Sequence, residues 1–398
     1  MEKFSSITTI YMGKDALADA VGGARRVFIV SDPFMVSSGK VSYVTDYLQG
    51  SGAEYEIFSD VQADPDIETV AAGMARIVEF KPDHVVVLGG GSPIDAAKAI
   101  VFFAHRQGAI PPCPFTAIPT TSGTGSEVSS FAVITDHKKN VKYPMVDDSL
   151  LPTSAVLNAE LVMSVPPKVT ADAGLDVLTH AIEAFVSTNR TDFTDAMAEK
   201  AIKLIYRYLL TVYREPGDYE ARQRVHNASC MAGIAFSNAG LGLNHAMAHT
   251  LGAKFHIAHG RANAILLPYV MSFNAGCATQ LTDTAKRYAK IAYLCDISTV
   301  SVRQSALNVI RTIRSWTKKM DIPPTIREAG VSEADFRGIV DLIRMDAQIY
   351  YNDDGSDVRE EPIPDAYREA AELAHATMLE KIAEVDDEIM EIYLSGDE

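Results

Sequence analysis

Three features are missing from the sequence, and each absence excludes a class of protein. The first twenty residues have no basic start and no unbroken apolar core, so they do not resemble a secretory signal peptide. No run reaches the roughly 18 apolar residues that a membrane helix needs. There is also no internal repeat or low-complexity tract. We expect a cytoplasmic protein without a membrane partner.

Cysteine and positive charge are both scarce. The four cysteines, Cys113, Cys230, Cys277 and Cys295, are widely separated and form no CxxC spacing, which indicates reduced thiols. The 36 Lys and Arg residues are outnumbered by 52 Asp and Glu residues, so the net charge is -16. This charge argues against nucleic acid or an anionic membrane surface as the partner and favours a soluble enzyme.

The pattern of elements changes along the 398 residues. From Val27 to about Val156, strands such as "VFIVSD", "EYEIFSD" and "HVVVLGGG" alternate with amphipathic helices, which is typical of a parallel sheet with crossover helices. After Pro166 and Pro167 almost everything is helical in period. The sequence predicts an α/β domain at residues 1–164, followed by an all-α domain at residues 165–398.

A glycine-rich turn follows one predicted strand. The stretch "HVVVLGGGSPIDAAKAI" reads as a buried strand, the turn Gly89-Gly90-Gly91-Ser92, and a helix with proline in its first turn. Glycines let the backbone approach a phosphate, and the start of a helix attracts anions. We predict a pyrophosphate site, although Ile94 departs from GxGxxG and a plain strand-to-helix turn would have the same sequence.

Two more polar features lie at strand ends, where open α/β sheets bind ligands. The loop "IPTTSGTGSEVSS" offers Thr120, Thr121, Thr124 and Ser126, although such a loop alone is most often only a turn. Asp32 ends "VFIVSD", where a carboxylate could hydrogen-bond an adenosine ribose and repel a 2′-phosphate. That role would favour NAD over NADP, and the alternative role is a helix cap.

Histidines are concentrated in "LNHAMAHTLGAKFHIAHGRANA", which holds four of the ten in the chain. His245 and His249 are four apart in a helical segment. Asp176 and His180 repeat that spacing in "AGLDVLTHAIEAF", so each pair projects from one helix face.

The next stretch, "GAKFHIAHG", is expected to break the helix and bring His256 and His259 back toward it. One carboxylate and up to four imidazoles, without a thiolate, suit a divalent first-row metal. The spacing leaves open whether His245 binds the metal with His249 or with His259.

At these residues the sequence resembles the iron-dependent (group III) alcohol dehydrogenase family over nearly its whole length. Within that family it is most similar to the 1-propanol dehydrogenases of bacterial diol-utilising microcompartments. The matching motifs, in order, are "GGGSPIDAAKAI", "IPTTSGTGSEVSS", "KYPMVDDSLLPTSAVLNAELVMSVPP", "DAGLDVLTHAIEAFVS" and "GLGLNHAMAHTLGAKFHIAHGRANAILLP".

The resemblance implies a nucleotide-binding α/β domain, a helical metal-binding domain and specific roles for residues of both. The implied metal ligands are Asp176, His180, His245 and His259. The implied NAD(H)-binding residues are Asp32, Gly89, Gly90, Gly91, Ser92, Asp95, Thr120, Thr121, Thr124 and Lys142. The implied metal is Fe²⁺, with Zn²⁺ as the alternative.

In this arrangement the metal acts as a Lewis acid on the substrate oxygen while a hydride passes between substrate and nicotinamide. His249 is our candidate for relaying the alcohol proton, and His256 is a second candidate whose alternative is a solvated turn residue. Phe131 and Phe236 are expected to shorten the pocket, which favours unsubstituted two-to-four-carbon aldehydes such as propionaldehyde. Both rings could instead be core residues.

Two other functions compete with this one. A lyase of the dehydroquinate synthase type would need a basic pocket for its phosphorylated substrate, and no Lys/Arg cluster lies beside the histidines. A non-catalytic scaffold would not need the intact ligand set. We also expect a homodimer or higher homo-oligomer, with residence in a microcompartment and contacts to its shell or enzymes as the alternative to free cytoplasm. An acidic helix at about 366–393 is a candidate contact segment.

Overall fold

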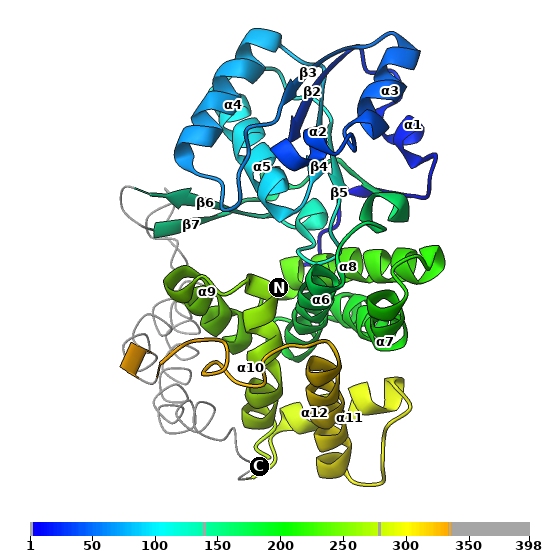
Figure 1. Ribbon diagram of the computed structural model, residues 1–398, viewed down its shortest axis with the longest axis vertical. Helices are drawn as coiled ribbons and strands as arrows, with labels where there is room; N and C mark the ends of the chain where they lie inside the picture. Colours follow the sequence, from blue (N-terminus) through cyan, green and yellow to red (C-terminus); the bar gives the residue numbers. More distant parts are fainter. Residues whose placement is uncertain (1–2, 138–140, 278–279, 333, 336–398) are drawn as a thin grey trace. The chain divides into compact units, whose positions relative to one another are not determined.

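The structure is a computed structural model that describes residues 3–137, 141–277, 280–332 and 334–335 (Figure 1). The acidic segment 366–393 lies outside these residues. The elements in chain order are β1 (Thr9–Met12), α1 (Ala16–Val21), β2 (Arg26–Ser31), α2 (Pro33–Ser37), α3 (Ser42–Ser51), β3 (Glu54–Phe58), α4 (Ile67–Phe80), β4 (His84–Gly89), α5 (Gly91–Arg106), β5 (Phe115–Pro119), η1 (Ser126–Val128), β6 (Phe131–Asp136), β7 (Val141–Val146), η2 (Asp148–Leu150), β8 (Ser154–Leu157), η3 (Ala159–Val162), α6 (Pro167–Val186), α7 (Asp192–Arg214), α8 (Tyr219–Ala239), α9 (Leu243–Phe255), α10 (His259–Asn274), α11 (Asp283–Leu294) and α12 (Val302–Lys319).

A six-stranded parallel sheet has the strand order β1-β8-β5-β4-β2-β3. Its central strands β2, β4 and β5 are mostly apolar because helices cover both faces of the sheet. In β2, Phe28 and Val30 join a core cluster with α4 and α5, whereas Val27 and Ile29 join a cluster with α1 and α3. Figure 1 shows these two helix pairs on opposite faces of the sheet. The predicted α/β fold with a parallel sheet is confirmed.

The strand order reverses at β2, which has β3 on one side and β4 on the other. The carboxyl ends of two strands at such a reversal diverge and leave a crevice where α/β sheets bind ligands. Ser31 at the end of β2 pairs with Leu88 near the end of β4. The residues that follow, Asp32 and Gly89, are therefore neighbours at this strand reversal.

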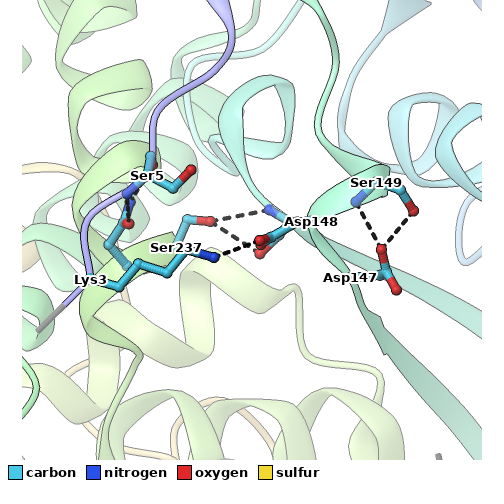
Figure 2. Close-up of polar contacts among 8 residues, drawn as sticks. Lys3, Ser5, Asp147, Asp148, Ser149 and Ser237 are labelled. Carbon is cyan, nitrogen blue, oxygen red and sulfur yellow. Dashed lines mark hydrogen bonds and ion pairs between the residues drawn. The ribbon is translucent and has the colours of Figure 1, made fainter. Parts of the chain in front are cut away.

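An antiparallel hairpin, β6 with β7, stands apart from the main sheet and was not predicted. A short 3-10 helix, η2, follows it, and Asp147 caps that helix by accepting a hydrogen bond from the Ser149 amide at 2.8 Å. Figure 2 shows this cap beside the ion pair of Lys3 with Asp148. Both members of the pair are about two-thirds exposed, so it contributes little to stability.

The described chain divides into two compact units, and the division falls inside α6. The first unit comprises residues up to Val177 together with Thr191–Asn238, so it includes α7 and most of α8 as well as the sheet. The second comprises Leu178–Arg190 and the chain from Ala239 onward, where α9 packs on α10 and α10 packs on α12. The domain boundary at residue 164 stays a prediction. No helix among the described residues is both long and apolar enough to cross a membrane.

Candidate active site

Four potential metal ligands converge from three helices. Asp176 and His180 lie one turn apart on α6, His245 lies near the start of α9, and His259 is the first residue of α10. One donor atom from each residue can be chosen so that all four lie within 4.8 Å of one another. Asp176, His180 and His245 are buried, and His259 is half-buried. The structure thus brings together the same four residues that the resemblance implies.

The geometry of this group fits a divalent ion. Two donors that each lie about 2.0–2.2 Å from one ion are at most about 4.4 Å apart. A spread of up to 4.8 Å therefore needs only small side-chain shifts to close on an ion. One carboxylate and three imidazoles form a donor set without thiolate, which iron, zinc and related ions all accept.

The other two histidines of the stretch have different places. His249 lies one turn after His245 on α9, and its ring stacks on that of His259 with centroids 4.9 Å apart. His249 therefore borders the four donors without being one of them. His256 is exposed and ends α9 in the left-handed conformation, with φ 56°. The chain does turn back after α9, as predicted, but it brings His259 and not His256 to the donor group.

The two predicted phosphate loops lie against each other. A Cβ added at Gly91, in the first turn of α5, would lie 2.9 Å from Cγ2 of Thr124. A Cβ added at Gly90 would lie 3.4 Å from Cγ2 of Thr121. A side chain at Gly91 would force Thr124 or its loop to shift, so close packing favours glycine at this position. Ser92 follows in the same helical turn, and Thr120 donates its amide to the carbonyl of Gly89 at 2.9 Å.

A buried cluster of charged residues, Lys98, Asp95 and Glu127, holds the second of these loops. Lys98 on α5 is 1% exposed, and its Nζ donates to the carbonyls of Ser129 and Phe131, at 2.7 Å in each case. Burial lowers the pKa of Lys98 to about 8, although Asp95 and then Glu127 oppose that shift. Burial also raises the pKa of Glu127 to about 7. The lysine thus ties the chain after the second loop to the helix that follows the first.

Asp95 has a structural task in this cluster. Its two carboxylate oxygens accept hydrogen bonds from the Ser126 hydroxyl, at 2.6 Å, and from the Val133 amide, at 3.1 Å. Burial raises its pKa, against the opposing charge of Lys98. Asp95 therefore shapes the second loop, and its predicted contact with a cofactor stays a prediction.

A histidine outside the metal group holds the middle of the second loop. His226 on α8 is fully buried, and its Nδ1 lies 2.9 Å from the hydroxyl of Ser122. Burial lowers its pKa to about 4, so the ring is neutral at pH 7. Next to Ser122, Gly123 packs closely on Ala173 of α6, one turn before Asp176. This contact links the second loop to the helix that carries the first two donors.

The remaining predicted residues lie at the start of α2, in the β6–β7 hairpin and on α8. Asp32 caps α2 through its Oδ1, which accepts from the Met35 amide at 2.9 Å, while its Oδ2 lies 3.4 Å from the position of a Cβ on Gly89. Asp32 is therefore a helix cap, and its second carboxylate oxygen also lies next to the glycine turn. Lys142 pairs with Thr135 in the β6–β7 hairpin, and its side chain lies outside the description. The rings of Phe131 and Phe236 lie 6.3 Å apart.

Several residues of the site escaped the sequence reasoning. Lys98 and Glu183 are charged side chains inside otherwise apolar helical runs, and that contrast is the signal that could have found them. The histidine and the two asparagines have roles that depend on contacts with other segments, so no local pattern marks them. The missed residues are Lys98, Glu183, His226, Asn244 and Asn263.

Both halves of the chain match models of one protein family. Residues 8–159 match the family model "Iron-containing alcohol dehydrogenase", and residues 170–370 match "Fe-containing alcohol dehydrogenase family, C-terminal". An NADPH-dependent butanol dehydrogenase of Clostridium saccharobutylicum is 42% identical over 359 residues, which cover 86% of this chain and 90% of the relative. A 1-propanol dehydrogenase of Salmonella typhimurium is 47% identical over 297 residues, which cover 74% and 78%.

Solved structures agree with these sequence matches. A 1,3-propanediol oxidoreductase superimposes with a TM-score of 0.80 at 32% identity, covering 87% of this chain and 94% of the other. An iron-containing alcohol dehydrogenase from Thermococcus thioreducens superimposes with a TM-score of 0.77 at 35% identity, covering 94% and 100%.

Proposed function

Because the chain belongs to the iron-containing alcohol dehydrogenases, and is therefore an oxidoreductase, we propose that it interconverts short-chain primary alcohols and aldehydes by hydride transfer with NAD(H). The observation that carries this proposal is the convergence of Asp176, His180, His245 and His259 on one point. These residues would hold Fe²⁺, with Zn²⁺ as the alternative. The bound ion would supply Lewis-acid polarisation of the substrate oxygen. The family assignment favours this reaction over the lyase and over a scaffold without turnover.

The first unit carries the proposed cofactor site. The two close-packed loops contribute the amides at the start of α5 and the hydroxyls of Thr121 and Thr124. Donors of this kind suit a pyrophosphate. Asp32 adds a carboxylate at the strand reversal, where it would repel a 2′-phosphate. On this ground we propose NAD(H), although the butanol dehydrogenase relative is named for NADPH. Lys40, half-buried beside Asp32, is the nearby cation that weakens this repulsion.

We assign transfer of the alcohol proton to His249 and the limit on substrate length to Phe131 and Phe236. His249 is half-buried and stacks on His259, so it can accept the alcohol proton and pass it toward solvent. Phe131 and Phe236, whose rings are tilted against each other, would limit the length of the substrate and offer no hydrogen bond to a second hydroxyl. On this ground we propose propionaldehyde and other unsubstituted aldehydes of two to four carbons as the substrates.

The proposal includes a homo-oligomeric enzyme, with residence in a bacterial microcompartment as the alternative to free cytoplasm. Similarity to 1-propanol dehydrogenases supports the choice of substrate, and light scattering of the purified protein tests the assembly state. Co-fractionation with shell proteins tests the location.

NADH oxidation by propionaldehyde tests the function. Metal-stripped protein is assayed with and without Fe²⁺ or Zn²⁺, together with His259→Ala. Lys203→Met, at an exposed position on α7, is the control. Turnover that needs the metal, is lost in His259→Ala and persists in Lys203→Met supports the proposal. Absence of turnover with every metal, in protein that binds NADH, would overturn it.

A further inference from the structure

Glu183 is a buried carboxylate that contacts one of the four donor residues without belonging to the group. It lies on α6, three residues after His180, and is 5% exposed. Its Oε2 lies 2.6 Å from Nδ1 of His245, whose side chain is fully buried. A carboxylate accepts hydrogen bonds and cannot donate them when ionised, so Nδ1 of His245 carries the proton. The ring nitrogen that can act as a metal donor is then Nε2.

The second oxygen of Glu183 holds the helix on which His245 lies. Oε1 accepts a hydrogen bond from the Asn244 amide, at 2.7 Å, in the first turn of α9. The carboxylate thereby satisfies an amide that has no partner within the helix and faces the positive end of the helix dipole. The approach is close, because a Cβ added at Gly242 would lie 2.8 Å from Oε1.

The same network reaches a second donor. Nδ2 of Asn244 donates to Oδ1 of Asn263 at 2.8 Å, and Nδ2 of Asn263 lies 3.1 Å from Nε2 of His259. Glu183, Asn244 and Asn263 are all buried, so bulk solvent screens these bonds little. His245 on α9 and His259 on α10 are thus both connected to Glu183 on α6.

We propose that Glu183 is a positioning residue of the metal centre. It selects Nε2 of His245 as the donor, fixes the plane of that ring and anchors the first turn of α9. It also places a second negative charge near the ion, beside that of Asp176. This inference rests on the proposed metal-dependent activity.

The test compares Glu183→Gln with Glu220→Gln, the same chemical change at an exposed position on α8. Glutamine has an acceptor oxygen at only one of the two carboxylate positions, so it cannot accept from both the Asn244 amide and Nδ1 of His245. We expect Zn²⁺ to bind Glu183→Gln about 10–100-fold more weakly than wild type in a chelator competition. We also expect an altered visible spectrum of the Co²⁺-loaded variant, and neither change in Glu220→Gln.

Gly242→Ala keeps the inference testable if Glu183→Gln does not fold. The added methyl group displaces the carboxylate without removing its charge, and the Zn²⁺ affinity should fall in the same direction by a smaller factor. The inference is overturned if the variants bind Zn²⁺ as wild type does. It is also overturned if affinity falls with an unchanged Co²⁺ spectrum and a less stable metal-free protein, because that result means general destabilisation. Wild type that binds no metal would instead refute the proposed function.

Discussion

Replacing Lys98 by methionine tests whether the charged cluster holds the second phosphate loop. The ammonium group donates to two carbonyls at 2.7 Å and to the hydroxyls of Ser126 and Ser129 at 3.1 and 3.2 Å. Methionine keeps most of the volume but removes the charge and all four hydrogen bonds. The neighbouring carboxyl groups of Asp95 and Glu127 then stay buried without a counter-charge.

The burial of Lys98 determines how much stability Lys98→Met loses. Lys98 is 1% exposed, so solvent does not screen its interactions. Removing one member of a buried, hydrogen-bonded ion cluster typically costs about 3–5 kcal/mol. For a unit of this size, that loss lowers the melting temperature by about 6–20 °C. Because Ser126, Ser129 and Phe131 lose their anchor, the KM for NADH should also rise.

The assay is urea denaturation at pH 7, followed by fluorescence, with the KM for NADH measured on the same preparations. Lys203→Met, at an exposed position on α7, is the control, and its stability should change by less than about 0.5 kcal/mol. A loss below about 1 kcal/mol in Lys98→Met, with an unchanged KM for NADH, would refute the reasoning.

Other residues that hold the two loops can be tested in the same way. Burial raises the pKa of Glu127 from 4.5 to about 7 in the folded protein, so the wild-type free energy of unfolding should fall by about 3 kcal/mol as pH rises through that window. Glu127→Gln should abolish this pH dependence. Urea titrations at pH 5 and pH 8 check this, and equal pH dependence in both proteins would contradict it. His226→Ala and Ser122→Ala should each raise the KM for NADH, and the double variant should show a coupling of about 1 kcal/mol because one hydrogen bond joins them; additive effects would count against that bond. Gly91→Ala should weaken NADH binding through the 2.9 Å approach to Thr124, as calorimetry can measure, while Zn²⁺ affinity stays at the wild-type value; unchanged NADH binding would show that the loops can yield.

The sequence alone determined the types of most elements, although not the β6–β7 hairpin, and the chemistry of the donors. Apolar runs such as "HVVVLG" predict strands buried on both faces, and β4 is such a strand. The i, i+4 pairs of Asp176 with His180 and of His245 with His249 each share a helix face because the helical repeat is local. Residue type and helix geometry are properties of neighbouring positions, so sequence is enough to read them.

Tertiary structure decided which of these residues meet. The spacing left open whether His249 or His259 joins His245, and the direction of α10 after the turn at His256 brings His259 to the donor group. Likewise, Glu183 reaches His245 across 62 positions and His226 reaches Ser122 across 104. Contacts over such separations depend on how whole helices pack, and no local pattern of residues encodes them.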